Sequence, residues 1–186
     1  MVNHRFVYKL LLLMLCLSLF ASASDGDESE EPSPSLFNTV GIRVGTDSGE
    51  KVSLNSYELY TRTAPFWSWD ISDALMAGIG FDSAIGILTG EGEEAAYVHL
   101  GFNCELVHEN LPISLVFTTG PSLYSEDTFD EYDLGGNVQF TSSVGFSWQI
   151  STNLAIEYRY QHTSNAGLES ENPGLDMHVA GISYSL

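Results

Sequence analysis

The feature that most constrains the fold is an alternation of apolar and polar residues that runs from Leu134 to Ile150. Even-numbered positions there carry mostly apolar side chains, whereas odd-numbered positions carry small or polar ones. Because successive side chains of a β-strand point to opposite faces, this pattern predicts a long strand with one apolar face. Eight segments of the chain show such alternation: 36–46, 52–70, 75–89, 94–108, 112–124, 132–150, 154–164 and 175–186.

The connections between these segments alternate in length. Tight connections are predicted at 72–73, 110–112 and 151–153, and looser ones at 46–51, 90–93, 125–131 and 165–174. Short turns on one side and longer loops on the other, over an even number of strands that are long enough to cross a bilayer, are typical of an outer-membrane barrel. The sequence therefore predicts an all-β fold over residues 36–186, an eight-stranded antiparallel transmembrane β-barrel of up-and-down topology.

A soluble β-sandwich or lipocalin-like barrel would also alternate, but it would turn its polar face to water and its apolar face inward. The polar face here carries small residues that suit a crowded lumen. Trp67 and Trp69 lie at the end of a segment, where membrane barrels gather interfacial aromatic residues. By parity, the charged residues on the polar face are Arg43, Glu58, Arg62, Asp82, Glu105, Glu157 and Arg159. Buried charges need partners, so we predict a packed, salt-bridged interior rather than an open pore.

The N-terminal residues have the features of a secretory signal peptide. Arg5 and Lys9 precede an apolar run from Leu10 to Phe20, which is too short to span a bilayer as a helix, and a small-x-small cleavage pattern follows at 21–23. We predict a signal peptide over residues 1–23 and an acidic, Pro/Ser-rich disordered leader over 24–35.

The charge of the chain excludes one class of partner. Asp and Glu number 25 against 6 Lys and Arg, for a net charge of −19. Such a chain has almost no cations with which to neutralise phosphates, so we expect no nucleic-acid partner. Disorder would also explain the charge, but a content of 44% hydrophobic and 12% aromatic residues argues against it.

Polar residues interrupt the apolar face of the last two segments. His162 and Ser164 lie on that face as neighbours, and Asp176 follows on the same face near the start of the next segment. An imidazole beside a hydroxyl can activate a serine nucleophile, and a carboxylate can fix the imidazole tautomer. Ionisable side chains are unfavourable on a lipid-facing surface, so this placement indicates a function.

Spacing alone leaves other interpretations open. These polar residues would cost little if they lay at the level of the lipid headgroups. His178 is a rival base, and Glu169 and Glu171 are rival acids. The acidic cluster at 126–131 is interpreted as a solvated loop.

The stretch from Tyr158 to Gly167, YRYQHTSNAG, is continued by Asn-Pro-Gly-Leu-Asp at 172–176. It resembles the C-terminal signature of the lipid A 3-O-deacylases, the PagL family. The resemblance covers residues 158–176; elsewhere only length, signal peptide and strand number agree. It implies an integral barrel of the bacterial outer membrane, with a serine hydrolase site that faces the outer leaflet.

When the functional positions of the family are transferred to this sequence, the resemblance implies a nucleophile at Ser164 and a general base at His162. The acid falls on Asp176, where the family often has Glu. The residues implied to support the site or the oxyanion are Asn165, Asn172 and Gly167.

The reaction implied by the resemblance is hydrolysis of the ester-linked 3-hydroxyacyl chain at position 3 of lipid A, with release of a 3-hydroxy fatty acid. The implied partners are lipopolysaccharide and outer-membrane lipids. We expect neither a metal nor an organic cofactor, and a homodimer stays open beside a monomer. Two alternatives remain, a non-catalytic structural or surface-interaction barrel and a phospholipase.

Overall fold

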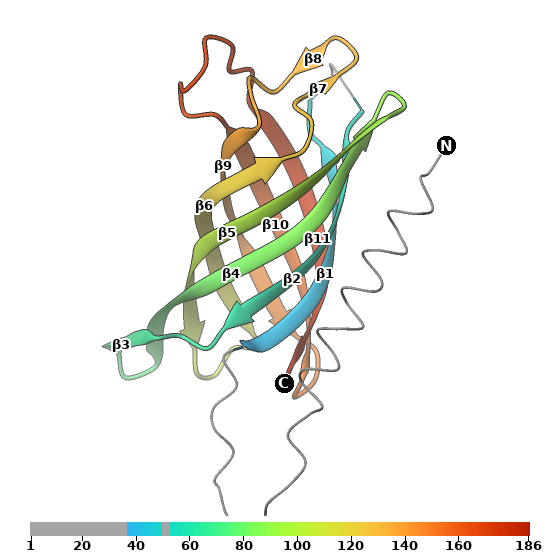
Figure 1. Ribbon diagram of the computed structural model, residues 1–186. Coiled ribbons are helices and arrows are strands. Elements are labelled where there is room, and N and C mark those ends of the chain that lie inside the picture. Colours follow the sequence, from blue (N-terminus) through green and yellow to red (C-terminus); the bar gives the residue numbers. More distant parts are fainter. Residues whose placement is uncertain (1–36, 50–52) are drawn as a thin grey trace, which may run out of the picture. The chain divides into compact units, whose positions relative to one another are not determined.

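The structure is a computed structural model that describes residues 37–49 and 53–186, and its wall strands form one antiparallel sheet closed into a barrel (Figure 1). The predicted signal peptide and leader lie outside the described residues. The strands of the wall are β1 (Phe37–Asp47), β2 (Asn55–Thr63), β3 (Trp67–Ser72), β4 (Leu75–Gly90), β5 (Glu93–His108), β6 (Ile113–Tyr124), β9 (Val138–Gln149), β10 (Leu154–Ser164) and β11 (Leu175–Ser185). Pairing of β1 with β11 and of β2 with β4 closes the sheet. No helix among the described residues is long and apolar enough to cross a membrane.

The predicted segment 52–70 is interrupted. It consists of β2 and β3, which residues 64–66 separate. Pro65 lies in this break, and proline has no N–H to donate to a ladder. Both strands pair with the same side of β4, so they occupy one place in the wall. The barrel therefore has eight strand positions, as the sequence predicts.

The prediction of one continuous strand over 132–150 is wrong for its first residues. Gly135 and Gly136 have φ angles of 77° and 98°, which end the extended conformation, and the wall strand starts only at Val138. The residues before the glycines belong to a small hairpin of β7 (Thr128–Phe129) and β8 (Tyr132–Asp133). This hairpin lies at one end of the barrel (Figure 1).

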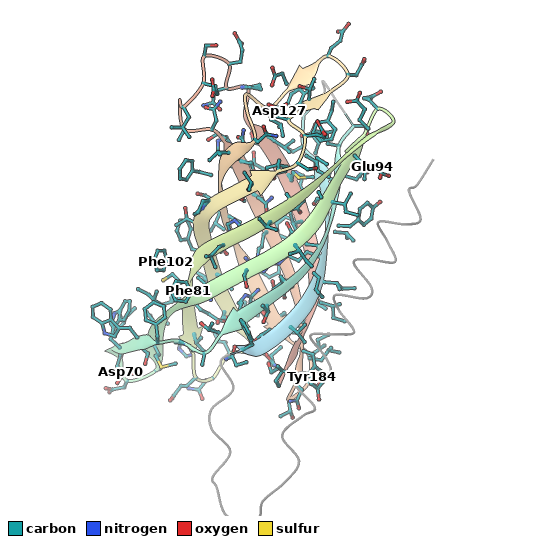
Figure 2. The ribbon with its side chains drawn as sticks, viewed as in Figure 1. Asp70, Phe81, Glu94, Phe102, Asp127 and Tyr184 are labelled. Carbon is teal, nitrogen blue, oxygen red and sulfur yellow. The ribbon has the colours of Figure 1, made fainter. Side chains whose placement is uncertain are left out.

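The prediction of a looser loop at 90–93 is also wrong. Only Glu91 and Gly92 separate β4 from β5, and their φ angles of 51° and 88° are both positive, as in a type I′ hairpin turn. This turn lies at the same end as the last residue of β1, the first residue of β2, and the connections 125–137 and 165–174. Figure 2 shows Glu94 and Asp127 at that end, and Asp70 and Tyr184 at the opposite end.

The outer face of the wall is apolar and the inner face is polar. Phe81 and Phe102 point away from the barrel (Figure 2), and many other outward side chains are large, hydrophobic and exposed. A soluble barrel would have the reverse arrangement. The exposed apolar surface is therefore the lipid-facing surface of a membrane barrel.

A balanced ionic network fills part of the lumen. Its members are all buried: Arg43, Arg62, Arg159, Glu58, Asp82 and Glu157. Asp82 Oδ2 lies 2.6 Å from Arg43 Nη2 and 3.1 Å from Arg62 Nε, and Arg159 Nη2 lies 3.1 Å from Glu157 Oε2. A cavity of about 10 Å³ remains among these side chains, about the volume that one water molecule needs. The predicted salt-bridged interior is confirmed for these residues.

A hydrophobic cluster fills the lumen nearer the long loops. Its buried members are Leu54, Leu88, Ala95, Tyr97, Tyr124, Phe129, Leu134, Leu175, Met177 and Val179. Leu134 was expected on the lipid-facing side, and this expectation is wrong because Leu134 follows the hairpin and is only 2% exposed. Burial of Phe129 and Leu134 attaches the β7–β8 hairpin to the start of β11, beside the candidate site.

Candidate active site

His162 and Asp176 are direct partners across the β10–β11 ladder, on the outer face of the barrel. His162 Nδ1 lies 2.7 Å from Asp176 Oδ1, and the two side chains are 52% and 43% exposed. An ionised Asp176 accepts the Nδ1 proton, which leaves Nε2 with its lone pair free. This is the tautomer in which an imidazole can take a proton from a hydroxyl group.

Ser164 is the last residue of β10 and lies on the same face as His162, two residues further along. In the described part of the chain, no hydrogen bond joins Ser164 to His162. Catalytic hydrogen bonds are often long without substrate and tighten in the substrate complex.

The imidazole of His162 lies close to Gly174, the residue that continues the register pairing Thr163 with Leu175. A Cβ placed on Gly174 would lie 3.0 Å from His162 Cε1 and 3.7 Å from Nε2. The φ angle of Gly174 is also positive, at 70°. Gly174 therefore leaves the space that the ring occupies, at the position across from Ser164.

Asn165 organises the loop after β10. Its side chain is fully buried, and Nδ2 donates to the carbonyl oxygens of Gly135 at 2.7 Å and Glu171 at 2.6 Å. Its Oδ1 accepts the N–H of Gly167 at 2.8 Å. These bonds use both amide hydrogens of Asn165 and the N–H of Gly167. Asn165 thus joins the loop to the residues that follow the β7–β8 hairpin.

Asn172 presents an amide donor in the same loop. Its Oδ1 accepts the N–H of Asn165 at 3.1 Å, next to Ser164 in the chain, and the residue is exposed. Its Nδ2 has no hydrogen-bond partner in the residues that the structure describes. The side chain is therefore held through its oxygen while its N–H groups remain available to a ligand.

Tyr132 of β8 supports the turn at Gly174. Its hydroxyl donates to the carbonyl oxygen of Gly174. Burial raises the pKa of Tyr132, and the negative charges of Asp47 and Asp176 raise it further. Tyr132 therefore stays protonated and keeps its donor at neutral pH.

Within the described residues, none of the rival residues makes a hydrogen bond or an ion pair with His162. His178 lies opposite Tyr160, and its Nδ1 is 2.8 Å from the hydroxyl of Tyr158. Glu169 and Glu171 lie in the exposed part of the loop. The acid that the structure brings to His162 is Asp176.

Sequence reasoning missed a second hydroxyl beside His162. Ser142 of β9 is the direct partner of His162 on the side away from Asp176, and its Oγ lies 2.8 Å from Thr119 Oγ1 of β6. The signal was present in the sequence, because Ser142 interrupts the apolar positions of its strand. The strand pairing that brings it to His162 was not predictable from that interruption.

The chain matches a family model described as lipid A 3-O-deacylase (PagL) over residues 55–185. It is 34% identical over 58 residues to the lipid A deacylase PagL of Bordetella bronchiseptica, a match that covers 31% of this chain and 33% of that protein. The matched part thus spans about a third of the length of this curated relative.

Two solved structures show the same fold. The crystal structure of the outer membrane enzyme PagL superposes with a TM-score of 0.70 at 18% identity, over 80% of this chain and 99% of that chain. A de novo designed transmembrane β-barrel has a TM-score of 0.54 at 16% identity, over 84% of this chain and 100% of that chain. Because the family model spans well over half of the sequence, and the fold agrees with it, this chain belongs to the lipid A 3-O-deacylase (PagL) family of outer-membrane β-barrels.

Proposed function

We propose that this protein is a serine esterase that hydrolyses the ester-linked 3-hydroxyacyl chain at position 3 of lipid A. The observation that carries the proposal is the His162–Asp176 contact on the lipid-facing wall, with Ser164 beside it at the end of the strand. An imidazole–carboxylate pair in such a place can reach an ester of a membrane lipid without the lipid leaving the bilayer.

In the proposed reaction, Ser164 Oγ attacks the ester carbonyl carbon while His162 Nε2 takes the hydroxyl proton. Asp176 stabilises the imidazolium that forms. Collapse of the tetrahedral intermediate breaks the bond to the sugar oxygen, which takes the proton back from His162. Water then hydrolyses the acyl-enzyme by the same steps and releases the 3-hydroxy fatty acid.

The tetrahedral intermediate needs a donor for its oxyanion. Asn172 is our assignment, because its Oδ1 is already held by the backbone of Asn165 and its Nδ2 is free. A preorganised amide of this kind stabilises developing charge without reorganisation during the reaction. To Asn165 and Gly167 we assign a supporting role, since the side-chain amide of Asn165 and the N–H of Gly167 already donate to acceptors of the protein.

The barrel's sidedness supports a site in the outer leaflet. The two ends of the described wall, at Phe37 and Ser185, lie together at the end opposite the long loops, and β10 runs from that end to Ser164. Outer-membrane barrels place their short turns in the periplasm and their longer loops outside. This orientation would bring Ser164 to the leaflet that holds lipopolysaccharide.

The test is to purify the protein from the membranes of an expressing bacterium, incubate it with lipopolysaccharide, and analyse lipid A by mass spectrometry. The expected result is the loss of one 3-hydroxyacyl unit and the appearance of a free 3-hydroxy fatty acid. Release of fatty acid from glycerophospholipids alone would instead support a phospholipase. No release from a barrel with heat-modifiable gel mobility would support the non-catalytic alternative.

Replacing Gly174 by alanine should lower kcat/KM for lipid A about tenfold or more while the barrel still folds. The added Cβ would lie 3.0 Å from the His162 ring, and the alanine would have to adopt a positive φ angle. Together these two effects are expected to cost about 1–3 kcal/mol locally. The measurement is the initial rate of fatty-acid release. Gly92→Ala is the matched control, because Gly92 in the β4–β5 turn also has a positive φ angle but open space around its Cβ position. Equal losses in both variants would contradict contact with His162 as the cause.

Replacing Asp176 by asparagine should lower kcat by about 100-fold or more, because the neutral amide cannot stabilise the His162 imidazolium. Asp176→Glu keeps the charge and should retain most of the rate. The two variants are compared at saturating lipid A by mass spectrometry. Activity of Asp176→Asn near that of Asp176→Glu would rule out Asp176 as the acid.

A further inference from the structure

We propose that Ser142 and Thr119 bind the 3-hydroxyl group of the substrate's acyl chain and make the enzyme selective for 3-hydroxyacyl esters. The inference rests on the proposed function, with the acyl chain attached to Ser164 during the reaction. It assigns a role in substrate specificity to two residues on β6 and β9, whereas the proposed catalytic residues lie on β10 and β11.

The two hydroxyl groups extend the catalytic pair sideways across the barrel wall. Thr119 of β6 is the ladder partner of Ser142 of β9, and Ser142 is the partner of His162 of β10. His162 is in turn the partner of Asp176 of β11. Polar side chains thus stand in one continuous row on the outer face of four adjacent strands.

The hydroxyl pair is surrounded by exposed apolar side chains. Phe140 and Val144 flank Ser142 along β9, Phe117 precedes Thr119 on the same face of β6, and Phe102 is the partner of Thr119 on β5. All four are exposed on the outer face. Two hydroxyl groups in such a surface face hydrocarbon rather than water. In hydrocarbon, a polar group without a hydrogen-bond partner is unfavourable.

The pair keeps one donor for a ligand. Ser142 Oγ and Thr119 Oγ1 lie 2.8 Å apart, and this is the one hydrogen bond of either hydroxyl within the described residues. Each hydroxyl has one hydrogen and two lone pairs. The bond between them uses one hydrogen, so one hydrogen and several lone pairs remain. A ligand with a hydroxyl group of its own can both accept from and donate to such a pair.

The distance from Ser164 fits the 3-hydroxyl of an acyl chain. Ser142 and Ser164 are diagonal neighbours in the β9–β10 ladder, and such neighbours are about 7–8 Å apart, with a somewhat shorter distance between their Cβ atoms. In the acyl-enzyme, the path from Cβ of Ser164 to Cβ of Ser142 through the 3-hydroxyl oxygen has about six covalent bonds of roughly 1.3–1.5 Å and one hydrogen bond of about 2.8 Å. A path of this length, bent at each atom, covers the distance.

The direction fits as well. Ser164 is the last residue of β10, at the end of the strand near the long loops. Ser142 pairs with His162, which precedes Ser164 on the same face, so Ser142 lies further from the long loops along the wall. An acyl chain that leaves the ester toward the bilayer centre therefore passes the hydroxyl pair first. A hydroxyl on its third carbon would find its partners there, and an acyl chain without that hydroxyl would leave the remaining hydrogen of the pair unbonded.

The experiment compares two synthetic glucosamine esters in detergent micelles, one with a 3-hydroxytetradecanoyl and one with a tetradecanoyl chain. The wild-type enzyme should have at least about a tenfold higher kcat/KM for the hydroxylated ester, since a site built for a hydroxyl disfavours the analogue that lacks it. In Ser142→Ala and in Thr119→Val this ratio should fall toward one, mainly through slower hydrolysis of the hydroxylated ester. Ser83→Ala, a serine on the outer face of β4 away from the site, should keep the wild-type ratio.

Each other outcome overturns the inference in a recognisable way. A wild-type ratio near one, or a ratio unchanged in both variants, overturns it while leaving the deacylase function intact. Loss of hydrolysis of both esters in Ser142→Ala, with activity kept in Ser164→Ala, would make Ser142 the nucleophile instead. Wild-type enzyme that hydrolyses neither these esters nor lipid A overturns the proposed function and this inference together.

Discussion

Replacing Ser164 by alanine should lower the rate of lipid A deacylation by at least about 1,000-fold, because the hydroxyl that forms the proposed acyl-enzyme is then absent. The side chain is at the end of a strand and makes no hydrogen bond within the described residues, so its loss should leave the barrel folded. The measurement is mass spectrometry of lipid A after incubation with the purified variant, with heat-modifiable gel mobility as the readout of folding.

The matched control is Ser83→Ala, which removes the same hydroxyl from the outer face of a distant strand and should deacylate at the wild-type rate. His162→Ala should lose as much activity as Ser164→Ala, and the double variant should lose little more, because the two residues act as one unit. Independent, additive losses would mean that His162 does not activate Ser164. Wild-type activity in Ser164→Ala would remove Ser164 from the mechanism.

Replacing Asp82 by asparagine should lower the free energy of unfolding by about 3–5 kcal/mol, the range for removing one partner from a buried ion pair. Asp82 is fully buried and lies within 4 Å of Arg43, Arg62 and Arg159 at 2.6, 3.1 and 3.8 Å. Without its charge, Glu58 and Glu157 would be the remaining ion-pair partners of the three guanidinium groups within the described part of the chain. The measurement is reversible urea unfolding in lipid vesicles, followed by tryptophan fluorescence.

Asp70→Asn is the control for this prediction, because Asp70 is exposed on β3 at the opposite end from the long loops (Figure 2). Its loss of charge should change the free energy of unfolding by less than about 0.5 kcal/mol. Equal stability of the two variants would contradict a structural role for the ionic network. Deacylation by folded Asp82→Asn should stay near the wild-type rate, since the network is separated from the outer face by the wall.

The orientation of most side chains in the wall was predictable from the sequence. The period of a strand is two residues and depends only on local backbone geometry, so parity placed Arg43, Arg62 and Asp82 in the lumen. The same parity placed His162 and Ser164 together on the outer face. Family membership was predictable from the residues between Tyr158 and Asp176, because they are close in the sequence.

The errors lay where backbone conformation changes over one or two residues. The alternation continues through Leu134 and Gly136, yet positive φ angles at Gly135 and Gly136 end the strand, and Leu134 turns into the lumen. Glu91 and Gly92 have the same kind of conformation and form a turn shorter than predicted. Hydrophobic periodicity does not report such angles, because side-chain type alternates whether or not the backbone stays extended.

Local periodicity by itself determined the strands, their two faces and the membrane-facing character of the wall. Only the tertiary structure decided which residues of different strands stand opposite each other. The register of β10 between β9 and β11 brings Asp176 to one side of His162 and Ser142 to the other. That register depends on closure of the whole barrel and on the packing of its lumen, which are non-local and leave no mark in the sequence of any one strand.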